Sequence, residues 1–161
     1  MEAIVLFAHG ARDPEWALPF EAIRDRVRAK RPGLRVELAF LEFMKPELAE
    51  TIGALAAQGM KNVTVFPVFM AQGGHLKNDV PVLVEDCRRR YPGTAVKLAS
   101  AVGDVPEILD AIAAWIVQSA ARALQMALPS CQPVLYCASP AKRAASLRAN
   151  VESLAVSQPS M

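Results

Sequence analysis

The stretch from Val63 to Met70 reads VTVFPVFM, a short apolar run rich in β-branched and aromatic residues. Three comparable runs lie at wide intervals along the chain: AIVLFA at Ala3–Ala8, LRVELAF at Leu34–Phe40 and TAVKLA at Thr94–Ala99. Runs of this length and composition are typical of strands in a parallel sheet. We therefore predict four strands, several of them buried on both faces.

Segments with the apolar spacing of helices separate and follow these runs. Their stripes are Trp16, Phe20, Ile23 and Val27; Leu48, Ile52 and Leu55; Val80, Leu83 or Val84, Cys87 and Tyr91; and Val105, Ile108, Leu109, Ile112, Trp115 and Ile116. Alternating strands and helices predict an α/β fold with a doubly wound or flavodoxin-like, mainly parallel sheet and right-handed crossovers. We expect all four stripes, including the tryptophans, to pack on that sheet.

Helix boundaries are marked by capping residues. Asp13, Asp79 and Asp104 each precede a helical pattern and are predicted N-caps rather than catalytic groups. The first three helices are predicted to end at Pro32-Gly33, Gly59 and Pro92-Gly93.

Composition limits the class of protein. With 161 residues, 53% of them hydrophobic and 21% charged, the chain suits one folded domain. A net charge of +2 and only 6% aromatic residues argue against a nucleic-acid partner. The three cysteines form neither a disulfide framework nor a zinc motif, so we expect a reducing cytoplasm. We expect no membrane span, because no apolar run is long enough.

The C-terminal part differs in composition from the rest. We predict one domain over residues 1–125 and an extension over residues 126–161, partly disordered at its end, because prolines and a Ser/Ala-rich stretch follow Leu128. A short strand at Pro133–Ala138 and a weak helix at about Ala141–Leu154 are expected within that extension.

Candidate site residues follow the predicted strands in order: His9, Glu42, His75 and Asp104. Ligands of open parallel sheets bind beyond the carboxyl ends of the strands, where these residues gather. The chain has only two histidines, and both fall at this edge beside glycine. Imidazoles with a carboxylate suit a divalent first-row metal and leave coordination positions open. Taken singly, either histidine could instead be a hydrogen-bonded loop residue, and Glu42 a solvated carboxylate.

Neighbouring residues offer further functions. Gly10, Gly73 and Gly74 permit positive φ angles or close approach of a flat ligand. Arg12 and Lys77 are either solvated charges or a clamp for an anionic substrate. Neither a dinucleotide or P-loop motif nor a GxSxG elbow is found, and the histidine phosphatase signature is excluded because Ala8 precedes His9.

Three segments carry a resemblance to a known family: AHGARD from Ala8, FLEFMKPEL from Phe40 and VFPVFMAQGGHLKNDVP from Val65. Over about residues 1–121 the chain resembles the small CbiX-type sirohydrochlorin chelatases, relatives of the class II ferrochelatases. The first motif reads HGAR where the family commonly has HGSR, and the histidine is kept.

The resemblance implies insertion of a divalent metal into a partly reduced tetrapyrrole that bears eight carboxylates. Co²⁺ is the first expectation and Fe²⁺ the second, with Ni²⁺ used by some archaeal members, in cobalamin or sirohaem biosynthesis. His9 and His75 would bind the metal and catalyse insertion, assisted by Glu42. Arg12, Lys77 and Lys45 would meet the carboxylates. The reaction needs no redox or nucleotide cofactor.

Long members of the family contain two similar halves, whereas short members act as homodimers, so we expect a homodimer. Two alternatives stay open. One is a carrier that binds metal or tetrapyrrole without insertion, and the other is a flavodoxin-like interaction domain whose histidines are structural.

Overall fold

The computed structural model describes residues 1–71 and 73–127, without the side chains of residues 74–77 and 124–127. In chain order, the elements are β1 (Glu2–Ala8), the 3₁₀ turn η1 (Pro14–Ala17), α1 (Leu18–Lys30), β2 (Arg35–Phe40), α2 (Leu48–Ala57), β3 (Asn62–Pro67), α3 (Gly74–Arg90), β4 (Ala95–Leu98), η2 (Val102–Asp104) and α4 (Pro106–Ala127). All four predicted strands are confirmed.

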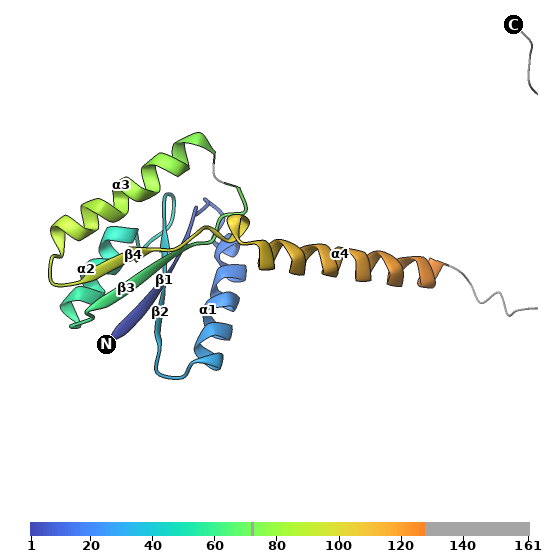
Figure 1. Cartoon of the computed structure of the whole chain (residues 1–161), viewed down its shortest axis with the longest axis horizontal. Coiled ribbons are helices and arrows are strands. Elements are labelled where there is room, and N and C mark those ends of the chain that lie inside the picture. Colours follow the sequence, from blue (N-terminus) through green and yellow to red (C-terminus); the bar gives the residue numbers. More distant parts are fainter. Residues whose placement is uncertain (72, 128–161) are drawn as a thin grey trace, which may run out of the picture. The chain divides into compact units, whose positions relative to one another are not determined.

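The strands form one sheet in the order β2-β1-β3-β4, and every neighbouring pair is parallel. Helix α1 lies on one face of the sheet, and α2 and α3 lie on the other (Figure 1). The predicted α/β fold with a doubly wound parallel sheet is therefore confirmed. Among the described residues, no helix is both long and apolar enough to cross a membrane.

Alternation along the strands divides the core into two clusters. On β1, Ala3, Val5 and Phe7 belong to the cluster under α2 and α3, whereas Leu6 and Ala8 belong to the cluster under α1. A strand that buries both faces has to be apolar throughout, which explains the continuous run AIVLFA.

Both edge strands are protected by an arginine from a neighbouring helix. Arg28 of α1 donates to the carbonyl oxygen of Val36 in β2, and Arg88 of α3 donates from Nε to that of Val96 in β4 at 2.8 Å. An unpaired strand edge is a template for pairing with another chain, and these side chains occupy part of it.

Two of the capping predictions have clear outcomes. Asp13 is confirmed as a cap, since its carboxylate accepts from the Glu15 amide at 2.9 Å at the start of η1. The N-cap assigned to Asp79 is wrong, because α3 already begins at Gly74 and has Gly73 as its N-cap. Pro81 suggested a first turn, but it lies inside the helix. The packing of the buried Val80 and Val84 compensates for the backbone hydrogen bond that proline cannot donate.

The predictions for the C-terminal part have separate outcomes. Asp104 ends η2 instead of directly preceding α4. The expectation that the fourth stripe packs on the sheet is wrong for its C-terminal part, since the Trp115 side chain is 65% exposed, whereas Val105, Ile108 and Ile112 are partly buried. The contacts divide the chain into two units, of which the first, Met1–Val117, contains the whole sheet. The strand and helix predicted within the extension lie outside the described residues, and the boundary near residue 125 stays a prediction.

Candidate functional site

The topology has a switch point at the carboxyl end of β1. This strand lies between β2 and β3, and the helices that follow β1 and β2 lie on opposite faces of the sheet (Figure 1). Ligands of doubly wound folds bind at such a switch point, outside the carboxyl ends of the strands. His9 directly follows β1, and Glu42 follows β2 by two residues.

His9 and Glu42 contact each other across this edge. His9 Nδ1 lies 3.4 Å from Glu42 Oε1, with the two side chains 43% and 46% exposed. The same nitrogen lies 3.3 Å from the Gly10 carbonyl oxygen. Backbone hydrogen bonds from Leu41 to Ala8 and from Glu42 to His9 extend the strand pairing beyond both strands. The two side chains are thus held together by the backbone and remain open to solvent.

Gly10 makes this approach of the two loops possible. Its φ is +90°, and a Cβ atom at this position would lie 1.9 Å from the Glu42 carbonyl oxygen. Any side chain would therefore push the Glu42 loop away from His9. The positive φ angle that we expected for Gly10 is found. The close approach that it permits is between the loop of His9 and the loop of Glu42.

Arg12 contacts an aromatic residue that sequence reasoning missed. Its guanidinium carbon lies 5.3 Å from the centre of the Phe43 ring, which is 58% exposed. Phe43 has φ +62° in a tight turn in which the Met44 amide donates to the Glu42 carbonyl at 2.8 Å. A left-handed conformation is uncommon for a bulky residue and holds the ring beside the site. The signal in the sequence that could have identified Phe43 is its position directly after Glu42, a candidate site acid.

Lys45 lies two residues before Glu47, the N-cap of α2, and its Nζ donates to Glu47 at 2.7 Å and to Glu50 at 2.9 Å. Hydrogen bonds to Glu47 first, and then to Glu50, raise the pKa of Lys45 above its usual value. Glu47 and Glu50 also form the capping box of α2. The charge of this predicted substrate-binding lysine is therefore already balanced by two carboxylates.

His75, Lys77 and Gly74 lie in the first turn of α3, preceded by Gly73 as N-cap. This helix follows β3, which pairs with β1, and the Val68 amide extends that pairing to Phe7 at 2.8 Å. The chain thus leaves β3 at the same edge as His9. A Cβ atom on Gly73 would meet nothing within 4 Å, so packing does not require glycine there.

Gly103 is a second position that sequence reasoning missed. A Cβ atom there would lie 1.9 Å from the Met70 carbonyl oxygen, and its amide donates to Phe69 at 3.0 Å. It joins the loop after β4 to the loop that leads into α3. The glycine of VGDVPE was a signal for this close approach.

The described side chains offer two donors of the kinds that divalent metals accept, an imidazole nitrogen and a carboxylate oxygen. No group of three or more metal-binding side chains occurs among the side chains that the structure describes, which do not include that of His75. A site with few protein ligands can bind an ion weakly and release it, as a transfer reaction needs.

Known proteins share both sequence and fold with this chain. A sirohydrochlorin cobaltochelatase from Methanococcus aeolicus is 34% identical over 84 residues, which are 52% of this chain and 59% of the relative. The chain spans between 39% and 59% of the length of three such curated relatives.

Among solved structures, the CbiX protein of Marinobacter aquaeolei is 29% identical with a TM-score of 0.68, covering 76% of this chain and 99% of its own. The sirohydrochlorin chelatase SirB of Bacillus subtilis, solved with cobalt, shares the fold at 23% identity and a TM-score of 0.62. The match covers 73% of this chain and 50% of SirB. The model of the CbiX family matches residues 3–119, and the chain belongs to that family.

Proposed function

We propose that this chain is a sirohydrochlorin chelatase that inserts a divalent metal into the macrocycle, with Co²⁺ as first choice and Fe²⁺ as second. The observation that carries the proposal is the contact between His9 and Glu42 at the switch point of the sheet. The names of the relatives support the substrate and favour cobalt.

His9 has one nitrogen engaged and one available. Nδ1 faces Glu42 and the Gly10 carbonyl oxygen, which leaves Nε2 to bind the incoming ion. A carboxylate beside the second ring nitrogen orients a metal-binding histidine and raises its basicity. Glu42 therefore acts through His9 and also adds a negative charge that favours the cation.

Metal insertion releases two pyrrole protons as the ion enters the ring. An imidazole and a carboxylate are both suitable acceptors, and an exposed pair can pass protons to water. His75 is the proposed second metal-binding and catalytic residue, because its helix starts at the same edge. Since the oxidation state of the metal does not change, the proposed reaction requires no redox or nucleotide cofactor.

Recognition of the macrocycle is proposed to involve Arg12 and Phe43. An exposed ring suits the flat face of a tetrapyrrole, and a guanidinium suits its carboxylates. Lys77 and Gly74, in the first turn of α3, and Gly10 and Gly73 are proposed to complete the binding surface. Lys45 is assigned a smaller part because it already pairs with two carboxylates.

We further propose a homodimer, since the chain covers 50% of SirB and a second copy would supply the other half. Residues 1–125 are proposed as the chelatase domain and residues 126–161 as an extension. A cytoplasmic location stays a prediction from cysteine usage.

The test is an insertion assay with the full chain. Purified protein is incubated with sirohydrochlorin and Co²⁺, Fe²⁺ or Ni²⁺ in turn, and the absorbance change of the macrocycle is followed against a protein-free control. The proposal requires acceleration with at least one metal, most strongly with Co²⁺. Binding of both ligands without acceleration would indicate a carrier instead and would refute the enzyme.

A further inference from the structure

Residues 68–70, which directly follow β3, are fastened to their neighbours on two sides. Toward β1, the Val68 amide donates to the Phe7 carbonyl oxygen at 2.8 Å. The buried Phe69 ring also meets the Phe7 ring edge-on, with centroids 5.7 Å apart. Toward the loop after β4, the Gly103 amide donates to the Phe69 carbonyl oxygen at 3.0 Å. These contacts fix the point at which the chain leaves β3.

The contact between Gly103 and Met70 leaves no room for a side chain. A Cβ atom at Gly103 would lie 1.9 Å from the Met70 carbonyl oxygen, 2.5 Å from its carbonyl carbon and 2.9 Å from its Cα. Since these are main-chain atoms, a change of rotamer cannot relieve the overlap. Non-bonded heavy atoms rest about 3.5 Å apart, so the Met70 backbone would have to move by about 1.5 Å. Gly103 has no positive φ angle, so glycine is needed here for space and not for backbone conformation.

Both candidate metal-binding histidines lie close along the chain to these contacts. His9 follows Phe7 by two residues, and His75 follows Phe69 by six. His75 lies in the first turn of α3, which begins at Gly74. The contacts of residues 68–70 therefore connect the strand that leads to His9 with the segment that leads to His75.

The body of α3 is held by the core and cannot follow a shift of Met70. Val80 and Val84 are almost completely buried and belong to the same cluster as Phe69. A displacement of the Met70 backbone thus has a fixed strand before it and a fixed helix body after it. It has to be taken up in the residues between them, which include His75.

We propose that Gly103 is a positioning residue for His75. By allowing the loop after β4 to approach Met70 so closely, it sets the point from which α3 starts and hence the place of His75 relative to His9. Phe69, which accepts the Gly103 hydrogen bond and packs on β1, belongs to the same support. The inference rests on the proposed function, in which the two histidines bind the metal together. Gly103 adds no ligand of its own and acts only through the segment that it supports.

A matched pair of glycine substitutions tests this role in the full chain. Gly103→Ala creates the overlap with Met70, whereas Gly93→Ala adds the same methyl group in the turn before β4, where it would meet nothing within 4 Å. Gly93 likewise has no positive φ angle. By isothermal titration, we expect G103A to bind Co²⁺ about 10–100-fold more weakly than G93A, as for residues that orient metal-binding histidines. Equal affinities would overturn the inference.

Nuclear magnetic resonance shows which histidine loses the metal. The chain has only two histidines, and a histidine bound to paramagnetic Co²⁺ has imidazole signals shifted far outside their ordinary range. Histidine is isotope-labelled, and His9→Ala and His75→Ala assign the signals. We expect both histidines to respond to Co²⁺ in the wild-type chain, but only His9 in G103A. Loss of both responses in G103A would indicate a general disruption and would overturn the positioning role, as would two unchanged responses.

A second variant serves if G103A does not fold, which its circular dichroism spectrum would show. Phe69→Leu removes the ring contact with Phe7 without introducing an overlap. We expect His75 in F69L to respond only at higher Co²⁺ concentrations while His9 responds as in the wild type, and an unchanged His75 would overturn the inference. If neither histidine responds in the wild-type chain, the proposed metal site fails as well, so the two failures are distinguishable.

Discussion

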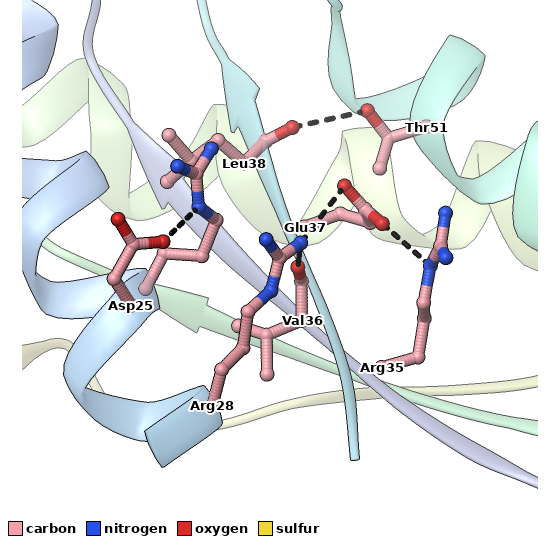
Figure 2. A network of polar contacts seen from close by, with 8 residues as sticks. Asp25, Arg28, Arg35, Val36, Glu37, Leu38 and Thr51 are labelled. Atoms are coloured by element: carbon pink, nitrogen blue, oxygen red, sulfur yellow. Dashed lines mark hydrogen bonds and ion pairs between the residues drawn. The ribbon is translucent and has the colours of Figure 1, made fainter. Parts of the chain in front are cut away.

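The two ends of the β1–β2 pair hold their charged residues in contrasting ways. At the carboxyl end, His9 and Glu42 share a single contact of 3.4 Å, and each side chain is nearly half exposed. At the amino end, Glu37 lies between two arginines, with Oε1 2.6 Å from Arg35 Nε and Oε2 3.7 Å from Arg28 Nη2 (Figure 2). Arg28 also donates to the Val36 carbonyl oxygen.

The difference separates a binding edge from a structural one. A hollow of about 650 Å³ lies at the amino end, lined by Arg28, Arg35 and Glu37 among others. It is larger than the apolar groove of about 540 Å³ on the face of the sheet, but its two guanidinium groups already pair with Glu37. Ligands of parallel sheets bind at the opposite edge. Size alone is therefore a poor guide to the site.

The strongest test of this comparison is His9→Ala, which removes the proposed metal-binding nitrogen. We expect turnover in the insertion assay to fall by about 10²–10⁴-fold, the usual contribution of a positioned acid or base. The melting temperature should hardly change, because the side chain is half exposed. Equal loss of turnover and of stability would mean that His9 is structural.

Glu42→Gln sharpens the assignment at the carboxyl end. The amide keeps the size of the side chain but loses its charge, so orientation of His9 and attraction of the cation both weaken. We expect a loss of about 10–100-fold in metal affinity or turnover, as for partners of metal-binding histidines. Isothermal titration with Co²⁺ and the insertion assay measure the two effects. Unchanged values in both would leave Glu42 a solvated carboxylate.

Glu37→Gln is the matched control at the amino end. It leaves Arg28 and Arg35 without their shared counter-charge, so we expect the free energy of unfolding to fall by about 1 kcal/mol. Turnover should stay at the wild-type level, since Glu37 lies at the far end of the strand. Urea unfolding measures the stability, and the insertion assay measures the turnover. A loss of turnover without a loss of stability would show that the amino end also serves the reaction, which contradicts the proposed difference between the two ends.

Local sequence patterns predicted most of the fold and part of the site. The β-branched runs located β1 to β4, and parallel pairing then brings His9 beside Glu42, because the carboxyl ends of parallel strands share one edge. Phe43 and Gly103 were missed because their roles depend on a positive φ and on contact between loops distant in sequence. Such contacts have no periodic signal.

Two other differences have physical causes of their own. The capping box at α2 has Glu47 as its cap, in place of the usual serine, threonine or aspartate, so Lys45 was not recognised as its partner. The stripe that contains Trp115 was predicted to be core, yet its members Leu109, Trp115 and Ile116 are exposed. Apolar spacing identifies which face of a helix seeks burial but not whether the same chain provides the partner.

The smallest expected effect concerns Lys45 and Glu50, charged residues that lie near the site but serve the helix. Hydrogen bonding from the Glu47 amide first, and then from Lys45, lowers the pKa of Glu50 from its ordinary 4.5. A carboxyl group with a lowered pKa in the folded state adds stability above its unfolded pKa and loses it as the pH falls through the folded value. Glu50→Gln should therefore lower the melting temperature slightly at pH 7, and the difference from wild type should shrink below about pH 4.5. Thermal unfolding at pH 7 and pH 3, with the exposed Glu2→Gln as control, measures this; a difference that is the same at both values would show that the charge of Glu50 contributes nothing to α2.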